Sequence, residues 1–289
     1  MWIPKEFTTA VCFLCTNNGE KVLFCGTAFF VAIPGADSPE LAIGYLVTAQ
    51  HCVRKAFDRY CNLSCRINTK GGGTKLIELP SPDSSNWFMS EDADVALLVL
   101  QEDESLGISA IPSQSFLTDD LMKKENIGLG DEVFLIGLFN LVHGRDRNYP
   151  IIRSGMIAMM PDEPLQDLDT GMDYRAFLVE ARSIGGLSGS PVFMALKKRG
   201  VEMRPTPRGF NPWTHSLVLV GLIRGHWDLE NRDFLSESGE HKTERLNTGI
   251  AIVTPIQEVE KVLMSDEVRK ERNAKIRALQ QKNTPTNPR

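Results

Sequence analysis

Short apolar runs, separated by turn-forming residues, make up most of the chain. They are rich in Val, Ile, Leu and Phe and bounded by Gly, Pro, Asn, Asp or Ser, which is the pattern of β-strands. Because no helical pattern lies between them, they favour an all-β protein built of barrels or sandwiches. The predicted strands form two series: Phe7–Thr16, Lys21–Ile33, Gly44–Thr48, Lys75–Leu79 and Val95–Leu100, then Glu132–Leu138, Ile151–Met160, Ala176–Ala181, Pro191–Leu196, Leu217–Arg224 and Gly249–Val253.

Helical periodicity begins only after Pro255. A proline suits the first turn of a helix, because the N–H that it lacks would be unpaired there. Beyond Met264 the sequence becomes highly charged, which predicts an exposed extension of the helix. Apolar residues recur at the spacing of one helix face, at Ile256, Val259, Val262 and Leu263.

Composition is that of an ordinary globular protein: 289 residues, 42% hydrophobic and 24% charged, with a net charge of −5. General nucleic-acid binding is not expected, because it needs a basic face to neutralise phosphates. No apolar run is long enough for a membrane-spanning helix. The segment Met1–Glu6 lacks the features of a secretory signal, so we expect a cytoplasmic protein. No cofactor is predicted.

Six cysteines leave two interpretations open. Cys12-x-x-Cys15 and Cys61-x3-Cys65 have spacings that a four-thiolate zinc site uses. The alternative is that they are buried small hydrophobic residues. We favour the second and predict no metal site, because neither pair lies in a glycine-rich turn.

Three segments supply the groups that a serine nucleophile needs. A serine hydroxyl requires a base beside it, a group that orients the base, and donors for the oxyanion. The segment Gly44–Val53 runs from a buried strand into a small-residue turn and presents His51. Asp94 directly precedes the apolar run Val95–Leu98, which makes it a better candidate than Asp92.

The third segment, Ser183–Val192, is rich in glycine and presents Ser188. Glycines allow positive φ and bring backbone N–H groups close to a substrate. Ser190 is a rival nucleophile, disfavoured because it sits directly against Pro191. The chain order His, Asp, Ser does not match an α/β-hydrolase, whose order is Ser, Asp or Glu, His.

These three segments resemble the histidine, aspartate and serine motifs of trypsin-like (chymotrypsin-fold) serine peptidases. The segment Thr248–Pro255, followed by a helix, is most similar to HtrA-like bacterial peptidase domains, here without a PDZ domain. The resemblance covers Phe7–Leu263. It implies two Greek-key six-stranded β-barrels of the chymotrypsin type plus a C-terminal α-helix: residues 1–106 with His and Asp, 107–254 with Ser, and 255–289 as helix and tail.

The resemblance also implies roles for individual residues. His51 would be the general base, oriented by Asp94, and Ser188 the nucleophile, with the N–H groups of Gly186 and Ser188 as the oxyanion hole. Arg182 and Arg224 would lie at the substrate pocket and favour an acidic side chain before the cleaved bond. The alternative, which we favour, is that one or both point to solvent. The departures from the secreted trypsins are Leu187 in place of an aspartate and Ser190 in place of a glycine.

Cys25 and Cys52 correspond to a pair that is bonded in secreted trypsins. In a cytosolic setting the two residues would be thiols. The sequence leaves both states open.

Two functions follow from this interpretation. The first is a serine endopeptidase that forms an acyl-enzyme with a protein or peptide substrate. The alternative is a catalytically latent or inactive module on a peptidase fold that binds a protein partner. Charged loops, at 196–212 and 228–246, or the C-terminal helix would then contact a regulatory protein.

Overall fold

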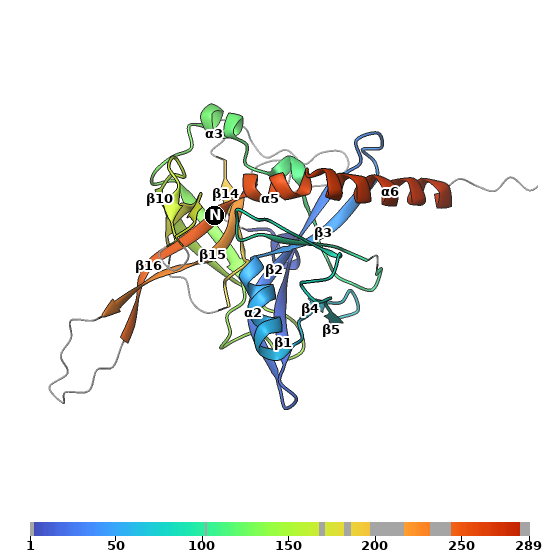
Figure 1. Ribbon diagram of the computed structural model, residues 1–289, viewed down its shortest axis with the longest axis horizontal. Helices are drawn as coiled ribbons and strands as arrows, with labels where there is room; N and C mark the ends of the chain where they lie inside the picture. Colours follow the sequence, from blue (N-terminus) through green and yellow to red (C-terminus); the bar gives the residue numbers. More distant parts are fainter. Residues whose placement is uncertain are drawn as a thin grey trace, which may run out of the picture.

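The computed structural model describes residues 3–101, 103–167, 171–181, 186–196, 217–231 and 244–283. Strands dominate it and form two main sheets that lie side by side, with two helices at the C-terminal end running across one side of the molecule (Figure 1). One buried apolar cluster extends through both sheets. Phe7, near the chain start, packs edge-on against Phe193 of the second sheet, with ring centroids 5.0 Å apart. The structure is therefore mostly β, which is the coarser part of the predicted all-β class.

The second sheet closes into a barrel of six strands, in the order β10-β13-β16-β15-β14-β9. Neighbouring strands are antiparallel, and their alternate side chains fill the interior with fully buried residues such as Val179, Val192 and Leu219. One of the two expected barrels is thus confirmed. Its strands are β9 (Glu132–Gly137), β10 (Ile151–Met159), β13 (Phe177–Glu180), β14 (Pro191–Ala195), β15 (Leu217–Asn231) and β16 (Glu244–Pro255).

The first sheet does not close. Seven of its strands follow one another in the order β5-β4-β1-β2-β3-β7-β6, and β8 (Ile111–Pro112) pairs in parallel with β2. The two ends of this order, β5 and β6, do not pair, so the expected second closed barrel is not found. The other strands are β1 (Val11–Asn17), β2 (Val22–Pro34), β3 (Ala42–Thr48), β4 (Ser64–Asn68), β5 (Thr74–Glu78), β6 (Trp87–Met89) and β7 (Ala96–Val99).

The short strand β6 forms one end of the first sheet. It lies within a stretch rich in Ser, Pro and Asp, where Trp87 and Phe88 are buried and pair with β7. The indole N–H of Trp87 donates to the carbonyl of Pro80 at 2.9 Å, which folds the preceding loop back on the sheet. Strand β6 thus covers the outer edge of β7 only as far as Leu98.

Helix α2 (Gln50–Tyr60) was not expected from the sequence. It follows β3 directly and buries Cys52, Val53 and Ala56 against the first sheet. It ends at Cys61, whose φ of 56° is the left-handed conformation that commonly terminates helices. Two shorter helices, α1 (Glu6–Thr9) and α3 (Asp119–Glu125), and the hairpin of β11 (Leu165–Gln166) and β12 (Asp173–Tyr174) complete these connections.

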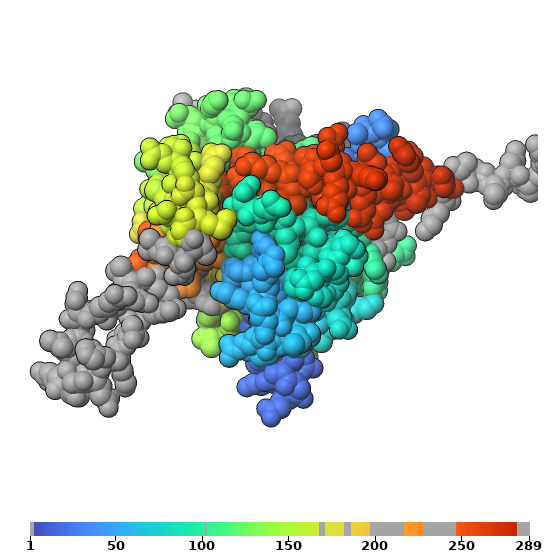
Figure 2. Space-filling model, in the orientation of Figure 1, coloured from blue at the N-terminus to red at the C-terminus, as the bar shows by residue number. Residues whose placement is uncertain are grey.

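The C-terminal segment forms two helices, α5 (Ile256–Leu263) and α6 (Asp266–Asn283). We expected an exposed extension after Met264, whereas α6 packs along the first sheet, as its red atoms show in Figure 2. Val268 and Ile276 are buried, and buried Arg272 donates to the carbonyl of Leu263 at 2.9 Å. This bond satisfies a carbonyl at the end of α5 that has no partner within the helix.

Within the described ranges, no helix combines the length and apolarity needed to cross a bilayer. Residues 284–289 and the greater part of the two charged loops lie outside the described residues.

Candidate active site

His51 lies at the start of α2, where β3 has just delivered the chain from the sheet. The first N–H groups of a helix have no partner within the helix. The N–H of His51 donates to Oδ1 of Asp94 at 2.8 Å, so a distant carboxylate caps the helix. A negative charge is favoured at this end because the helix dipole is positive there.

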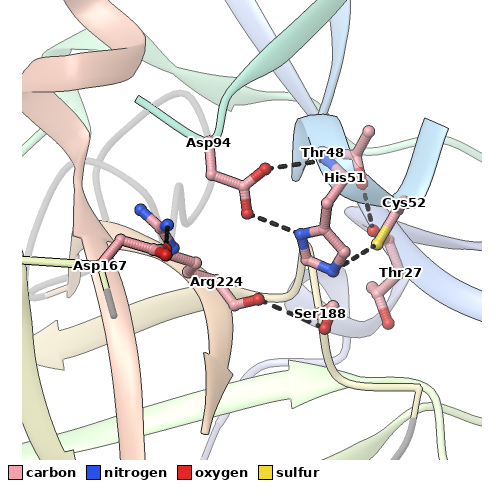
Figure 3. A network of polar contacts seen from close by, with 8 residues as sticks. All are labelled: Thr27, Thr48, His51, Cys52, Asp94, Asp167, Ser188 and Arg224. Carbon is pink, nitrogen blue, oxygen red and sulfur yellow. Dashed lines mark hydrogen bonds and ion pairs between the residues drawn. The ribbon is translucent and has the colours of Figure 1, made fainter. Parts of the chain in front are cut away.

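Asp94 also binds the imidazole. Its second oxygen, Oδ2, lies 2.6 Å from Nδ1 of His51, so one carboxylate holds both the backbone and the ring of the same residue (Figure 3). Burial tends to raise the pKa of Asp94, but the hydrogen bonds from His51 and the positive charges of His51 and Arg224 lower it overall. The carboxylate therefore stays ionised and fixes the ring with Nε2 pointing away from Asp94.

The other ring nitrogen of His51 contacts a thiol. Nε2 lies 3.6 Å from Sγ of Cys52, the next residue in the chain. Burial tends to lower the pKa of His51, but its contacts with Cys52 and with Asp94 outweigh burial and raise the pKa to about 10. In this arrangement the ring keeps its proton at neutral pH, whereas a general base must be able to accept one.

Ser188 lies in the loop that precedes β14, of which the structure describes Gly186 onward. Gly186 has φ +99° and Gly189 has φ +82°, the region that favours glycine. A side chain at Gly189 would overlap the carbonyl oxygen of Thr27, and one at Gly186 would overlap the side chain of Asn140. Both glycines are thus needed for this loop to pack closely against its neighbours.

Thr27, on β2, anchors the serine loop to the first sheet. Its hydroxyl donates to the carbonyl of Gly186 at 2.8 Å and accepts from the N–H of Leu138 at 2.9 Å. Its backbone N–H donates to the carbonyl of Ser188 at 2.9 Å. A residue of the first sheet therefore sets the position of a loop that belongs to the closed barrel.

The structure brings Ser188 next to the His51 ring, with the two side chains adjacent in Figure 3. The hydroxyl of Ser188 donates to the carbonyl of Arg224 at 3.4 Å. Among the bonds of the described residues there is none between Ser188 and His51. Of the two links that a Ser-His-Asp arrangement needs, the His–Asp link is formed, and the Ser–His link is not.

The backbone N–H groups of Gly186 and Ser188 have no acceptor within the described residues. Unused N–H groups beside the serine are what an oxyanion hole requires. The rival serine, Ser190, is fully buried against Gly137 and has no hydrogen-bond partner for its hydroxyl among the described residues. Of the two hydroxyls, Ser188 is therefore the one placed beside His51.

The two predicted pocket arginines have different outcomes. Arg182 lies outside the described residues. The guanidinium of Arg224 binds Asp167 at 2.5 Å and stacks on the Tyr174 ring, 3.9 Å from its centroid. The charge of Arg224 is thus already balanced by Asp167, beside which its side chain lies in Figure 3.

All six cysteines are free thiols, including Cys25 and Cys52. Within the described chain, no group of three or more His, Cys, Asp or Glu side chains is arranged to hold a metal ion. Of the four cysteines with zinc-like spacing, Cys12, Cys15 and Cys65 are buried on β1 and β4, whereas Cys61 is exposed at the end of α2. Burial raises the pKa of Cys15 to about 12, as expected for an unreactive buried thiol.

Sequence reasoning did not identify Thr27, the Cys52 thiol as a contact of His51, or Asp167 as the partner of Arg224. Thr27 stands in an ordinary strand, and no local pattern distinguishes it. Cys52 was considered only as a disulfide partner. Its position directly after His51, at the start of a helix, is the signal that would have pointed to this contact.

No family model and no curated protein sequence matches the chain. Among solved structures, the MamO protease domain from Magnetospirillum magneticum (apo form) is similar over 90% of this chain and 98% of that one, with 16% identity and a TM-score of 0.50. The Rv3671c protease (inactive form) covers 89% of this chain and 88% of its own, at 14% identity and TM-score 0.46. A mutant of Rv3671c from M. tuberculosis, also in an inactive form, gives 14% identity, coverage of 89% and 87%, and a TM-score of 0.44. At such identities the likeness to the MamO domain shows the fold: the chain has the fold of a trypsin-like protease domain, as its motifs predicted.

Proposed function

We propose that the chain is a serine endopeptidase that cleaves protein or peptide substrates through an acyl-enzyme. The observation that carries this proposal is the double hold of Asp94 on the N–H and Nδ1 of His51, with Ser188 beside the same ring. A carboxylate on Nδ1 fixes the tautomer that leaves Nε2 available as the base. The adjoining serine loop is rich in glycine, and its N–H groups at Gly186 and Ser188 have no acceptor among the described residues, which supports the same proposal.

The proposed reaction has two halves, acylation and deacylation of Ser188, and in each of them His51 first accepts a proton and then donates it. The hydroxyl oxygen of Ser188 attacks the carbonyl carbon of the peptide bond while Nε2 of His51 takes the hydroxyl proton. The oxyanion accepts hydrogen bonds from the N–H groups of Gly186 and Ser188. His51 then gives the proton to the departing amine. Water enters, loses a proton to the same nitrogen and attacks the acyl carbon. The bond from this carbon to the Ser188 oxygen then breaks, His51 returns the proton to that oxygen, and the acid leaves.

The resting geometry favours a second candidate: a latent enzyme. Nε2 contacts Cys52 and the Ser188 hydroxyl donates to Arg224, so both partners of the missing link are engaged elsewhere. Rotation of the two side chains would exchange these contacts for the Ser–His bond. Catalytic hydrogen bonds often tighten only when substrate binds. On this reading, substrate or a regulatory partner brings Ser188 and His51 into contact.

Peptide hydrolysis by two serine variants tests the proposal. Ser188→Ala should lower kcat by about 10⁴-fold or more, because the nucleophile is lost. Ser190→Ala is the matched comparison and should retain turnover, since its hydroxyl is buried away from His51. Turnover that survives Ser188→Ala and disappears in Ser190→Ala would overturn the assignment. A mixed library of protein substrates, assayed by new amino termini, avoids dependence on one cleavage preference.

A further inference from the structure

A cleft of ≈ 1010 Å³ occupies the opening of the first sheet, between β5 and β7. It is separate from the serine loop: none of the residues lining it belongs to the closed barrel. A smaller hollow of ≈ 490 Å³ adjoins it beneath α6 and shares Leu100 and Lys275 with it. The gap between the two ends of the first sheet therefore contains a cleft large enough to hold a ligand.

One wall of the cleft is the unpaired edge of β5. In an antiparallel pair, successive residues direct their backbone groups alternately toward and away from the neighbouring strand. The N–H of Leu79 donates to Leu63, so Leu79 and every second residue before it bond toward β4. The backbone groups of Leu76 and Glu78 consequently face the cleft.

The opposite wall is the unpaired end of β7. The N–H of Leu100 donates to Gly44, so Leu100 and Leu98 bond toward β3. Val99 and Gln101 therefore direct their backbone groups toward the cleft. Strand β6 pairs with β7 only as far as Leu98 and leaves this end uncovered. Two strand edges with unused backbone groups thus border the same cleft.

We propose that this cleft binds an extended segment of a partner protein, which adds as a strand beside β5 and β7. A residue in a packed strand occupies about 160 Å³, from a rise of about 3.3 Å, a strand spacing of about 4.8 Å and a layer spacing of about 10 Å. The cleft volume then corresponds to about six residues, close to the five residues of β5. Strand addition to an exposed edge is a recurrent way of binding peptides.

The lining predicts which side chains the segment carries. The floor is apolar: Leu46 is fully buried, and Cys65 and Ile67 are each 2% exposed. Since successive side chains of a strand alternate in direction, every second residue of the segment would be apolar and face this floor.

The rim of the cleft is acidic once its own ion pairs are considered. Lys75 binds Asp103 at 2.7 Å, and Lys275 binds Glu271 at 3.4 Å. Glu78 and Glu104 have no ion pair among the described residues. The charge of the rim that remains after these ion pairs is negative. The residues of the segment that point away from the apolar floor, toward this rim, would therefore be lysine or arginine. The proposed ligand is thus an extended segment in which apolar and basic residues alternate.

Binding here would act on the elements that hold His51 and Asp94. Phe57 lines the cleft from α2, the helix that begins beside His51, and Leu98 lines it from β7, which follows Asp94. A strand added between β5 and β7 would contact α2 through Phe57 and β7 through Leu98, and so would hold both elements in place. The partner would occupy a surface distinct from the one that carries Ser188.

The test uses the full chain with Ser188→Ala, so that a peptide is not cleaved, and a fluorescein-labelled peptide of about six residues alternating lysine and valine. Fluorescence anisotropy should show saturable, micromolar binding. The same peptide N-methylated at every second residue, or with glutamate for lysine, should bind at least about tenfold more weakly, because it loses the edge hydrogen bonds or the charge match.

Variants locate the site. The double variant Glu78→Lys, Glu104→Lys should weaken binding about tenfold, whereas the matched pair Glu20→Lys, Glu40→Lys, which changes net charge equally at exposed positions elsewhere, should leave it unchanged. Leu76→Pro should also weaken it, by removing an N–H that faces the cleft without breaking the β4 ladder. Absence of saturable binding, or equal affinity in the two double variants, would overturn the proposal. A peptide bound beside Ser188 instead would give that second result.

Discussion

The two sheets contribute unequally to the candidate active site. In the open first sheet, His51 and Asp94 are already joined by two hydrogen bonds, through strands β3 and β7 that are direct neighbours. In the closed barrel, Ser188 lies in a loop whose position depends on Thr27 of the other sheet, and its hydroxyl is bonded to Arg224. The His–Asp pair needs only contacts within the first sheet, whereas the link to Ser188 depends on contacts between the sheets. Activity would therefore be controlled at the second link.

The largest expected loss of activity comes from breaking the hydrogen bond between Asp94 and the His51 ring, which is already formed in this structure. Asp94→Asn keeps an oxygen for the His51 N–H but loses the charge that holds Nδ1–H, so the ring can adopt the wrong tautomer. We expect kcat for peptide hydrolysis to fall about 10⁴-fold. Asp92→Asn, two residues away and exposed, is the control and should retain activity. Equal losses in the two variants would mean that Asp94 has no special relation to His51.

The second prediction tests the contact between the sheets. Thr27→Val keeps the shape of the side chain but leaves the carbonyl of Gly186 and the N–H of Leu138 buried without their partner. We expect unfolding to become easier by about 2 kcal/mol and kcat to fall about tenfold or more as Ser188 loses its position.

Thr16→Val is the matched control for this change. Thr16 is also buried in the first sheet, but its hydroxyl has no hydrogen-bond partner among the described residues. Chemical denaturation and initial rates measured on both variants separate the two cases. If Thr27→Val behaves like Thr16→Val, the serine loop is positioned by its own barrel and the contrast drawn between the sheets is wrong.

The third prediction concerns pH. The raised pKa of His51, about 10, means that the ring is protonated at neutral pH and becomes a base only as pH rises toward that value. The acid limb of kcat/KM should therefore lie above the ordinary histidine pKa of about 6.5. Cys52→Ala removes the sulfur that contacts Nε2 and helps to raise the pKa of the ring, so it should move this limb to lower pH and raise kcat/KM several-fold at neutral pH.

Cys25→Ala is the control for the pH profile, since Cys25 is a neighbouring thiol that does not act on the pKa of His51. Its profile should match that of the unmodified chain. A Cys52→Ala profile that does not move, or that moves to higher pH, would contradict the assignment of Cys52 as the group that holds the ring in its resting state.

The features that could be predicted from the sequence are those determined by neighbouring residues in the chain. The eleven strands of the two predicted series alternate or cluster apolar residues strongly enough to be recognised, and the segments around His51 and Ser188 carry their own motifs. What it missed depends on distant partners. Trp87 and Phe88 sit in a stretch rich in Ser, Pro and Asp, and only the exposed edge of β7 makes a strand of them.

The start of α2 illustrates the same limit. Its sequence is strongly polar, and its first N–H groups need Asp94, more than forty residues away, as a cap. The extension of α6 was expected to be exposed because of its charges. Its buried side, with Val268, Arg272 and Ile276, becomes apparent only when the first sheet lies beneath it. Thr27 likewise gains its role only when the two sheets meet.

The most direct test of the account is the site of covalent labelling by a fluorophosphonate, which reacts with a serine that is activated by a neighbouring base. The native chain should be labelled at Ser188, as located by mass spectrometry of the modified peptide, and His51→Ala should abolish labelling. Modification of the native chain at another residue, or labelling of Ser188 that persists in His51→Ala, would contradict the claim that His51 activates Ser188.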